Sequence, residues 1–189
     1  MTAAKSLTPA ELETALTYIA ARPHAVRNRV MLLVTVMAGL RVGEVADLTL
    51  ADVRNRDGSI KSEIYLASHR VKHGYARTVY VSTRLQAELA VYVGSRTWHE
   101  TTQPLFYTHR GPRRGFSANT LSQHFFWLYR RAGISASSHS GRKTFLTSLA
   151  SQGISVFVLA SLAGHKSIST TQKYVSVNDD MKRRAVELV

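Results

Sequence analysis

Apolar residues recur at helical spacing along most of the chain. The segment from about Val26 to Met37 is apolar on more than one face, which is typical of a helix buried on all sides. Ahead of it, Thr8-Pro9-Ala10-Glu11 combines a capping residue, a proline suited to the first helical position and an acid that can reach back to the cap. The sequence therefore predicts a first helix from Thr8 to about Ala21 and a central helix after it.

Further helical patterns follow a short segment of different character. A short helix is expected near Val42, after Gly39. The other predicted helices span about Thr83 to Val93, Ala118 to Arg131, Ser140 to Ser151, Val156 to Ala163, Ser169 to Tyr174 and Asp179 to Val186.

Between these helices, residues 52–82 carry a β pattern. Arg56-Asp57-Gly58 is a turn signal, and Ser62 to Ala67 and Arg77 to Val81 are rich in β-forming residues. The predicted fold class is mainly α (α+β): a multihelical domain with a small antiparallel three-stranded sheet at one edge.

Length and charge narrow the class of partner. The chain has 189 residues and a net charge of +13, which fits one domain with a strong positive field and favours a polyanion as partner. Neither a membrane span nor a signal peptide is expected, so the interpretation is nucleic acid rather than membrane, in the cytoplasm and associated with the nucleoid. The absence of cysteine excludes disulfides and cysteine-based zinc sites.

The last third of the chain holds the candidate chemistry. From Thr101 to Asn178 there is no Asp or Glu, while basic residues recur. In this region His139-Ser140-Gly141-Arg142 precedes Gly164-His165 and then Tyr174. An arginine fork and imidazoles suit phosphate, and a phenol beside cations can act as a nucleophile. The pattern indicates a site that holds phosphate and attacks it with oxygen.

Two further cations lie outside that region. Arg41 stands in Gly39-Leu40-Arg41-Val42-Gly43-Glu44 at a predicted helix start, where anions are favoured, and Glu44 is placed to support it. Lys72 is predicted at a hairpin tip, where an ammonium can protonate a leaving oxygen. Taken singly, each has an ordinary explanation as a helical ion pair or a solvated turn lysine. The whole ordered set is harder to explain in that way.

With these motifs together, the chain resembles the tyrosine recombinase (phage integrase) family, and specifically its short, single-domain type. Gly39 to Val45 resembles the box of the first arginine, and Lys72 with Arg77 to Val81 resembles the hairpin-lysine segment. His139-x-x-Arg142 is similar to the second box, and Leu162 to Tyr174 to the box that ends in the nucleophile.

The resemblance implies a role for each residue. Arg41, His139, Arg142 and His165 would surround the scissile phosphate, and Lys72 would protonate the leaving 5′-oxygen. Tyr174 would form a 3′-phosphotyrosyl link, with Glu44 supporting Arg41. Neither a metal nor another cofactor is implied.

The resemblance also implies an organisation. Residues 1–177 would form the catalytic domain, and residues 178–189 a tail helix. The resemblance implies that this tail is exchanged between protomers, and the alternative, a tail that folds back on its own domain or frays, stays open. The partners implied are double-stranded DNA, a homo-tetramer on paired DNA sites and accessory DNA-bending proteins.

Other functions remain open at this point. A non-cleaving DNA-binding regulator of recombination sites would share the charge but has no need of Tyr174 and Lys72 together. A relaxing topoisomerase would act on any plasmid without paired sites. A zinc site at His69-x-x-x-His73 is disfavoured, because the sequence offers it no third ligand.

Overall fold

The computed structural model describes residues 4–70, 76–108, 114–177 and 179–187. In chain order its elements are α1 (Pro9–Ala20), α2 (Ala25–Met37), α3 (Val42–Ala46), α4 (Leu50–Val53), β1 (Glu63–Leu66), the 3₁₀ turn η1 (Ser68–Arg70), β2 (Arg77–Tyr80), α5 (Thr83–Gly94), α6 (Ala118–Arg131), α7 (Ser140–Ser151), α8 (Val156–Ala163), α9 (Ile168–Gln172) and α10 (Asp179–Val186). The predicted multihelical class is confirmed. No helix in the described part of the chain has the length and hydropathy of a membrane span.

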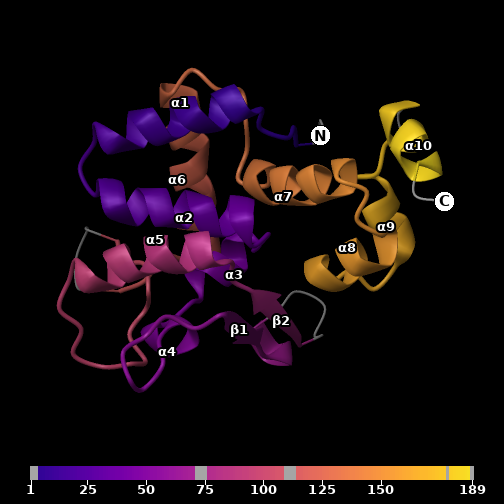
Figure 1. Ribbon diagram of the computed structural model, residues 1–189. Helices are drawn as coiled ribbons and strands as arrows, with labels where there is room; N and C mark the ends of the chain where they lie inside the picture. Colours follow the sequence, from indigo (N-terminus) through magenta and orange to yellow (C-terminus); the bar gives the residue numbers. More distant parts are fainter. Residues whose placement is uncertain (1–3, 71–75, 109–113, 178, 188–189) are drawn as a thin grey trace.

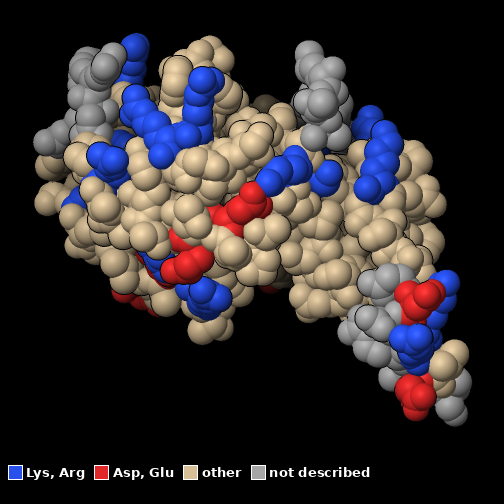
Figure 2. Space-filling view, turned by 90° about the horizontal axis from the view of Figure 1, so that it is seen from above, with Lys and Arg blue, Asp and Glu red and all other residues tan. Residues whose placement is uncertain are grey.

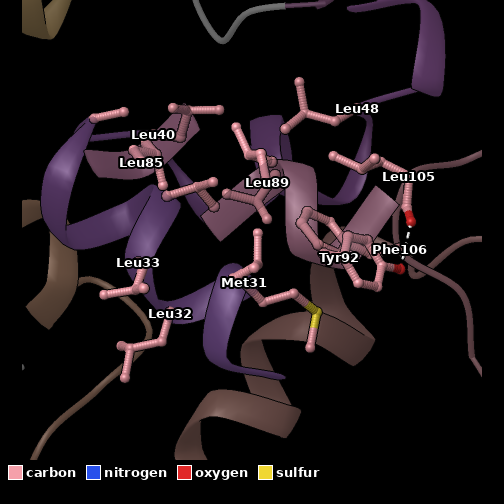
Figure 3. Close-up of a cluster of buried hydrophobic side chains, with 14 of the residues drawn as sticks. Met31, Leu32, Leu33, Leu40, Leu48, Leu85, Leu89, Tyr92, Leu105 and Phe106 are labelled. Carbon is pink, nitrogen blue, oxygen red and sulfur yellow. Dashed lines mark hydrogen bonds between the residues drawn. The ribbon is translucent and has the colours of Figure 1, made fainter. Parts of the chain in front are cut away.

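The core is built around α2, as its all-round apolar pattern predicts. Residues 30–34 of this helix are all buried, and α2 contacts α1, α3, α5 and α7. Figure 3 shows Met31 next to Leu89, inside a cluster of leucines from the neighbouring elements. The Tyr92 hydroxyl donates to the Leu105 carbonyl at 2.7 Å, the dashed line in Figure 3, which satisfies the hydroxyl inside an apolar setting.

Local capping explains where several helices begin. At α1, the Thr8 hydroxyl accepts from the Glu11 amide and the Glu11 carboxylate accepts from the Thr8 amide, which is the capping box expected from the sequence. Ser117 caps α6 and Ser155 caps α8 by the same kind of side-chain acceptance. These caps fix the entries of the helices that frame the site.

The sheet is smaller than predicted. Strands β1 and β2 pair antiparallel, with Glu63 opposite Tyr80 and Leu66 opposite Arg77, and within the described residues they are the two strands of the sheet. The expected third strand is wrong: within the described residues, the turn at residues 56–58 is flanked only by the isolated bridge between Arg54 and Ile60. The reason is the tight turn at Asp57, whose carboxylate accepts from the Ser59 amide at 2.9 Å, so the chain turns back before a ladder can form.

The elements fall into two groups that meet along α7. In Figure 1, α1, α2, α5 and α6 lie together on one side, α7 to α9 on the other, the sheet at the lower edge, and α10 beyond α9. Helices α2 and α7 approach very closely, because a Cβ on Gly141 would lie 2.0 Å from Thr35 Oγ1. This contact brings the start of α7 against the turn between α2 and α3, where Arg41 is.

Candidate active site

Arg142 lies at the centre of the candidate site. It is buried on α7, and its guanidinium donates to the Gly39 carbonyl at 2.6 Å and to the Ala163 carbonyl at 2.6 Å. A further donor reaches His165 Nε2 at 3.2 Å. Because arginine offers five N–H donors, donors remain for an anion after these contacts. Arg142 therefore ties three segments together and still has hydrogen-bonding capacity.

The surroundings of Arg142 disfavour its positive charge. Burial lowers the pKa of Arg142 to about 9, and the nearby positive charges of Arg41 and Arg77 act in the same direction, while Glu44 and Tyr174 oppose them. The group still carries its proton at neutral pH. A bound anion would raise the pKa of Arg142 again, because an opposite charge favours the charged form.

His165 follows the end of α8. Gly164 ends that helix in the left-handed conformation, with φ 61°, which glycine adopts without steric cost. His165 Nδ1 lies 2.9 Å from Thr171 Oγ1. Since arginine can only donate, Nε2 must accept from Arg142, and the ring proton is therefore on Nδ1 and donated to Thr171.

The same surroundings keep the His165 ring neutral. Burial lowers the pKa of His165 to about 4, and the positive charges of Arg142, Arg41 and Arg77 lower it in the same direction. At neutral pH the ring is therefore uncharged and held in one tautomer.

Tyr174 lies in the turn after α9, which ends two residues earlier than the predicted helix. Its amide donates to the Thr171 carbonyl at 2.9 Å, a three-residue spacing that tightens the chain out of the α-helix. The half-buried ring stacks on His165, with ring centroids 6.0 Å apart and planes at 20°. Ring stacking thus places the phenol beside the Arg142–His165 pair.

Arg41 reaches the site from the start of α3. Its guanidinium donates to Glu44 Oε1 at 2.9 Å and its amide to Glu44 Oε2 at 2.7 Å, which is the support expected from the spacing. Glu44 is buried and also accepts two bonds from Arg77. Burial alone would raise the pKa of Glu44, but the hydrogen bonds and charge of Arg77, with those of Arg41, bring it below its ordinary value. Glu44 is therefore ionised.

The two remaining predicted residues differ in what the structure says of them. His139 is the exposed N-cap residue of α7, three residues before Arg142. Lys72 and His73 lie outside the described residues, so the structure says nothing of a hairpin lysine. Among the described residues, no three His, Asp or Glu side chains are grouped as metal ligands. The site thus brings Arg41, Arg142, His165 and Tyr174 together.

Comparison with known proteins identifies the family. The sequence profile described as the phage integrase family matches residues 5–181. This chain belongs to the phage integrase family. Among similar members, the tyrosine recombinase XerA of Pyrococcus furiosus is 30% identical over 97% of this chain and 61% of its own length. The tyrosine recombinase XerC of Pelobacter propionicus is 31% identical over 83% of this chain and 50% of its own length. This family member thus spans little more than half the length of such relatives.

Solved structures of phage integrase family proteins have the same fold. A crystal structure of XerA recombinase superposes with a TM-score of 0.75 at 24% identity, covering 100% of this chain and 66% of that one. The Tn1549 transposon integrase, solved in complex with circular intermediate DNA, superposes with a TM-score of 0.75 at 21% identity, covering 99% of this chain and 67% of that one. The likeness establishes the fold of the domain.

Two residues of this site in the family member were not anticipated from sequence. The sequence placed Arg77 in a predicted strand and in the segment that resembles the hairpin-lysine box, without a role of its own, yet its guanidinium is buried against Glu44. Thr171 is fully buried and binds His165. The available signal for Arg77 was its place in the strand, because it shares the inward face with Val79, and a charge on an inward face needs a partner.

Proposed function

We propose that this chain cleaves and rejoins DNA strands at specific sites through a covalent 3′-phosphotyrosyl link on Tyr174. The observation that carries the proposal is the connected row of Arg142, His165 and Tyr174: a buried guanidinium bound to a neutral imidazole on which a phenol is stacked. Converging cations suit a phosphodiester whose charge grows in the transition state.

Cleavage begins at the Tyr174 phenol. The Tyr174 phenol loses its proton to solvent, and its oxygen forms a bond to the scissile phosphorus. The bond from phosphorus to the 5′-oxygen breaks, and that oxygen leaves with the electron pair and takes up a proton. Arg41, Arg142 and His139 are assigned to the non-bridging oxygens, and Lys72, on the family resemblance, to the proton for the leaving oxygen.

Rejoining is the same step in reverse. A 5′-hydroxyl attacks the phosphotyrosyl phosphorus, and the tyrosine leaves with its proton restored. Because one phosphoester bond replaces another, the strand is resealed to a new partner without a nucleotide cofactor.

The proposed partner is double-stranded DNA. The net charge of +13 favours a polyanion, and Figure 2 shows basic side chains along the upper half of one face, with acidic ones gathered below. The Tn1549 integrase was solved with DNA, which supports the same partner here. A protein of this kind would act at the nucleoid, in the cytoplasm.

The proposed assembly is a homo-tetramer on paired DNA sites, assisted by DNA-bending proteins. In Figures 1 and 2, α10 stands away from the main body beyond α9, and Val186 on it is exposed. This placement supports a catalytic domain of residues 1–177 with a tail, 178–189, that is exchanged between protomers.

Substitution of the nucleophile tests the proposal. Tyr174→Phe removes only the attacking oxygen, so it should abolish SDS-stable adducts on a library of nicked DNA duplexes while leaving the gel shift of the same duplexes unchanged. The matched control is Tyr65→Phe, since Tyr65 is an exposed tyrosine on β1, and it should form adducts at the wild-type rate. Undiminished adducts with Tyr174→Phe would overturn the proposal. Binding without adducts in the wild type would favour a non-cleaving regulator of recombination sites.

A further inference from the structure

We infer that Arg77 is a positioning residue of the candidate site, which holds Glu44, and through it Arg41, in place beside His165. The inference rests on the proposed function, because it assigns Arg41 to the phosphate. Arg77 itself is 9% exposed and its guanidinium is bound to the Glu44 carboxylate, so it acts through other groups.

The Glu44 carboxylate is shared between two arginines. Arg77 donates to Glu44 Oε1 at 2.5 Å and to Oε2 at 2.8 Å, which is the two-point geometry that suits a guanidinium and a carboxylate. The same two oxygens accept from the Arg41 guanidinium and amide. Each oxygen is therefore fixed by two donors, and the carboxylate cannot rotate without breaking bonds to both arginines.

Arg77 also contacts the other half of the site. A Cβ on Gly164 would lie 2.7 Å from Arg77 Cδ, so the Arg77 stem packs directly against the turn that leads into His165. Strand β2 and helix α8 are in contact here. One side chain thus spaces the α3 side of the site, with Arg41, from the α8 side, with His165.

The charge of the group gives Arg77 a second effect. Arg41, Arg77 and Arg142 with Glu44 leave two net positive charges, and the charges of Arg41 and Arg77 lower the pKa of Arg142, beside the larger effect of its burial. If Arg77 were absent, the whole Glu44 charge would pair with Arg41 and weaken its pull on phosphate. A buried ion pair adds little to stability compared with apolar residues of similar volume, so fold stability alone is a weak reason for this arrangement.

The first test compares Arg77→Met and Arg77→Lys with wild type. Single-turnover adduct formation is measured on the nicked duplexes recovered by wild-type trapping, with duplex affinity measured in parallel. Displacement of a catalytic group by about 1 Å can cost about 10²-fold in rate, and we expect a loss of that order for Arg77→Met with little change in affinity. Arg77→Lys keeps the charge but cannot span both Glu44 oxygens. Its rate of adduct formation should lie between those of the wild type and Arg77→Met. Arg77→Lys also serves if Arg77→Met does not fold.

The matched control is Arg29→Met. Arg29 makes the same two-point contact with Glu88, at 2.8 Å and 2.6 Å, but between α2 and α5, away from the site. It should leave the adduct rate unchanged. An equal loss in Arg29→Met and Arg77→Met would overturn the inference.

A modified substrate separates positioning from simple structural support. In a methylphosphonate duplex a methyl group replaces one charged non-bridging oxygen, so the need for Arg41's charge decreases. We expect the ratio of wild-type to Arg77→Met rates to shrink on this duplex, whereas an unchanged ratio would contradict a role through Arg41. If the wild type forms no adduct on any duplex, the proposed function fails and the inference falls with it. If the wild type forms adducts and Arg77→Met forms them at the same rate, the inference fails while the proposed function stands.

Discussion

Two buried arginines in this protein look alike and differ in what surrounds them. Arg27 on α2 and Arg142 on α7 are 9% and 7% exposed, and each lies near a histidine whose pKa is lowered to about 4, first by burial and then by the arginine charge. For Arg27 this histidine is His124, and for Arg142 it is His165. Cavities of about 690 Å³ and 650 Å³ adjoin Arg27 and His165, so cavity size does not distinguish the two regions.

The difference lies in the partners. The Arg27 guanidinium donates to the Tyr107 carbonyl and twice to Asn28 Oδ1, and the Phe116 ring lies 5.3 Å away. These are neutral acceptors and an aromatic cover, typical of an arginine that holds a fold together.

The neighbours of Arg142 include two further arginines and a phenol. Like charges close together disfavour each other's charged forms, and a bound anion would offset this repulsion. Arg27 also has one arginine, Arg96, and the Tyr92 phenol nearby. Burial, a lowered histidine pKa and a nearby phenol are therefore shared by both regions, whereas the second arginine beside Arg142 and the stacking of Tyr174 on His165 distinguish the candidate site.

The largest expected effect separates the two arginines by activity. Arg142→Lys keeps a charge but loses the fork, and removal of one transition-state donor typically costs about 10²–10³-fold in rate, so adduct formation should fall by that order. Arg27→Met leaves the Tyr107 carbonyl and Asn28 side chain without their donor, which typically costs about 1–3 kcal/mol of stability. Its folded fraction should form adducts at the wild-type rate. Equal losses of adduct rate in both variants would break the comparison.

A smaller effect is expected at two glycines with similar backbones. Gly153 has φ 84° with nothing within 4 Å of an added Cβ, whereas Gly164 has φ 61° and its Cβ would meet Arg77. Left-handed backbone costs a non-glycine residue about 1–2 kcal/mol, so Gly153→Ala should lower the free energy of unfolding by that amount with no change in adduct rate. Gly164→Ala should destabilise further and slow adduct formation. Denaturant unfolding and single-turnover assays measure both, and identical behaviour would contradict the contact with Arg77.

The smallest effect concerns the two histidines and pH. Both histidine pKa values lie below the ordinary 6.5. Between about pH 6.5 and pH 4 the unfolded chain therefore binds more protons at these histidines than the folded chain does. The free energy of unfolding consequently falls as the pH drops through this range. His124→Phe should reduce that fall. In ring-carbon NMR titrations, sulfate should raise the pKa of His165, whose lowering comes partly from three arginine charges, and leave that of His124 in place. Equal pKa shifts of His165 and His124 would contradict anion binding specifically beside His165.

Much of the fold follows from local chemistry in the sequence. The caps at Thr8 and Ser117 and the apolar run of α2 act within a few residues, so their helices were predictable. Helix α4 has four residues and η1 three, which is too short for any periodicity to register. The missing third strand depended on how tightly the chain turns at Asp57, which a turn signal alone does not give.

The site divides in the same way. The order and spacing of Arg41, His139, Arg142, His165 and Tyr174 predicted a phosphate site, and four of these converge in the structure, although their roles stay predictions. Arg77 bonds to Glu44 across 33 positions of sequence, and that pairing exists only once β2 lies beside α3. Residues that act through tertiary partners have no local pattern by which to find them.

The most direct measurement locates the covalent bond. Wild-type protein is mixed with the nicked duplex library and quenched in SDS, and the adducted peptides are digested and sequenced by mass spectrometry. The account predicts a nucleotide remnant on Tyr174, linked through the 3′-phosphate. An adduct on another residue, or no adduct on duplexes that the protein demonstrably binds, would contradict it.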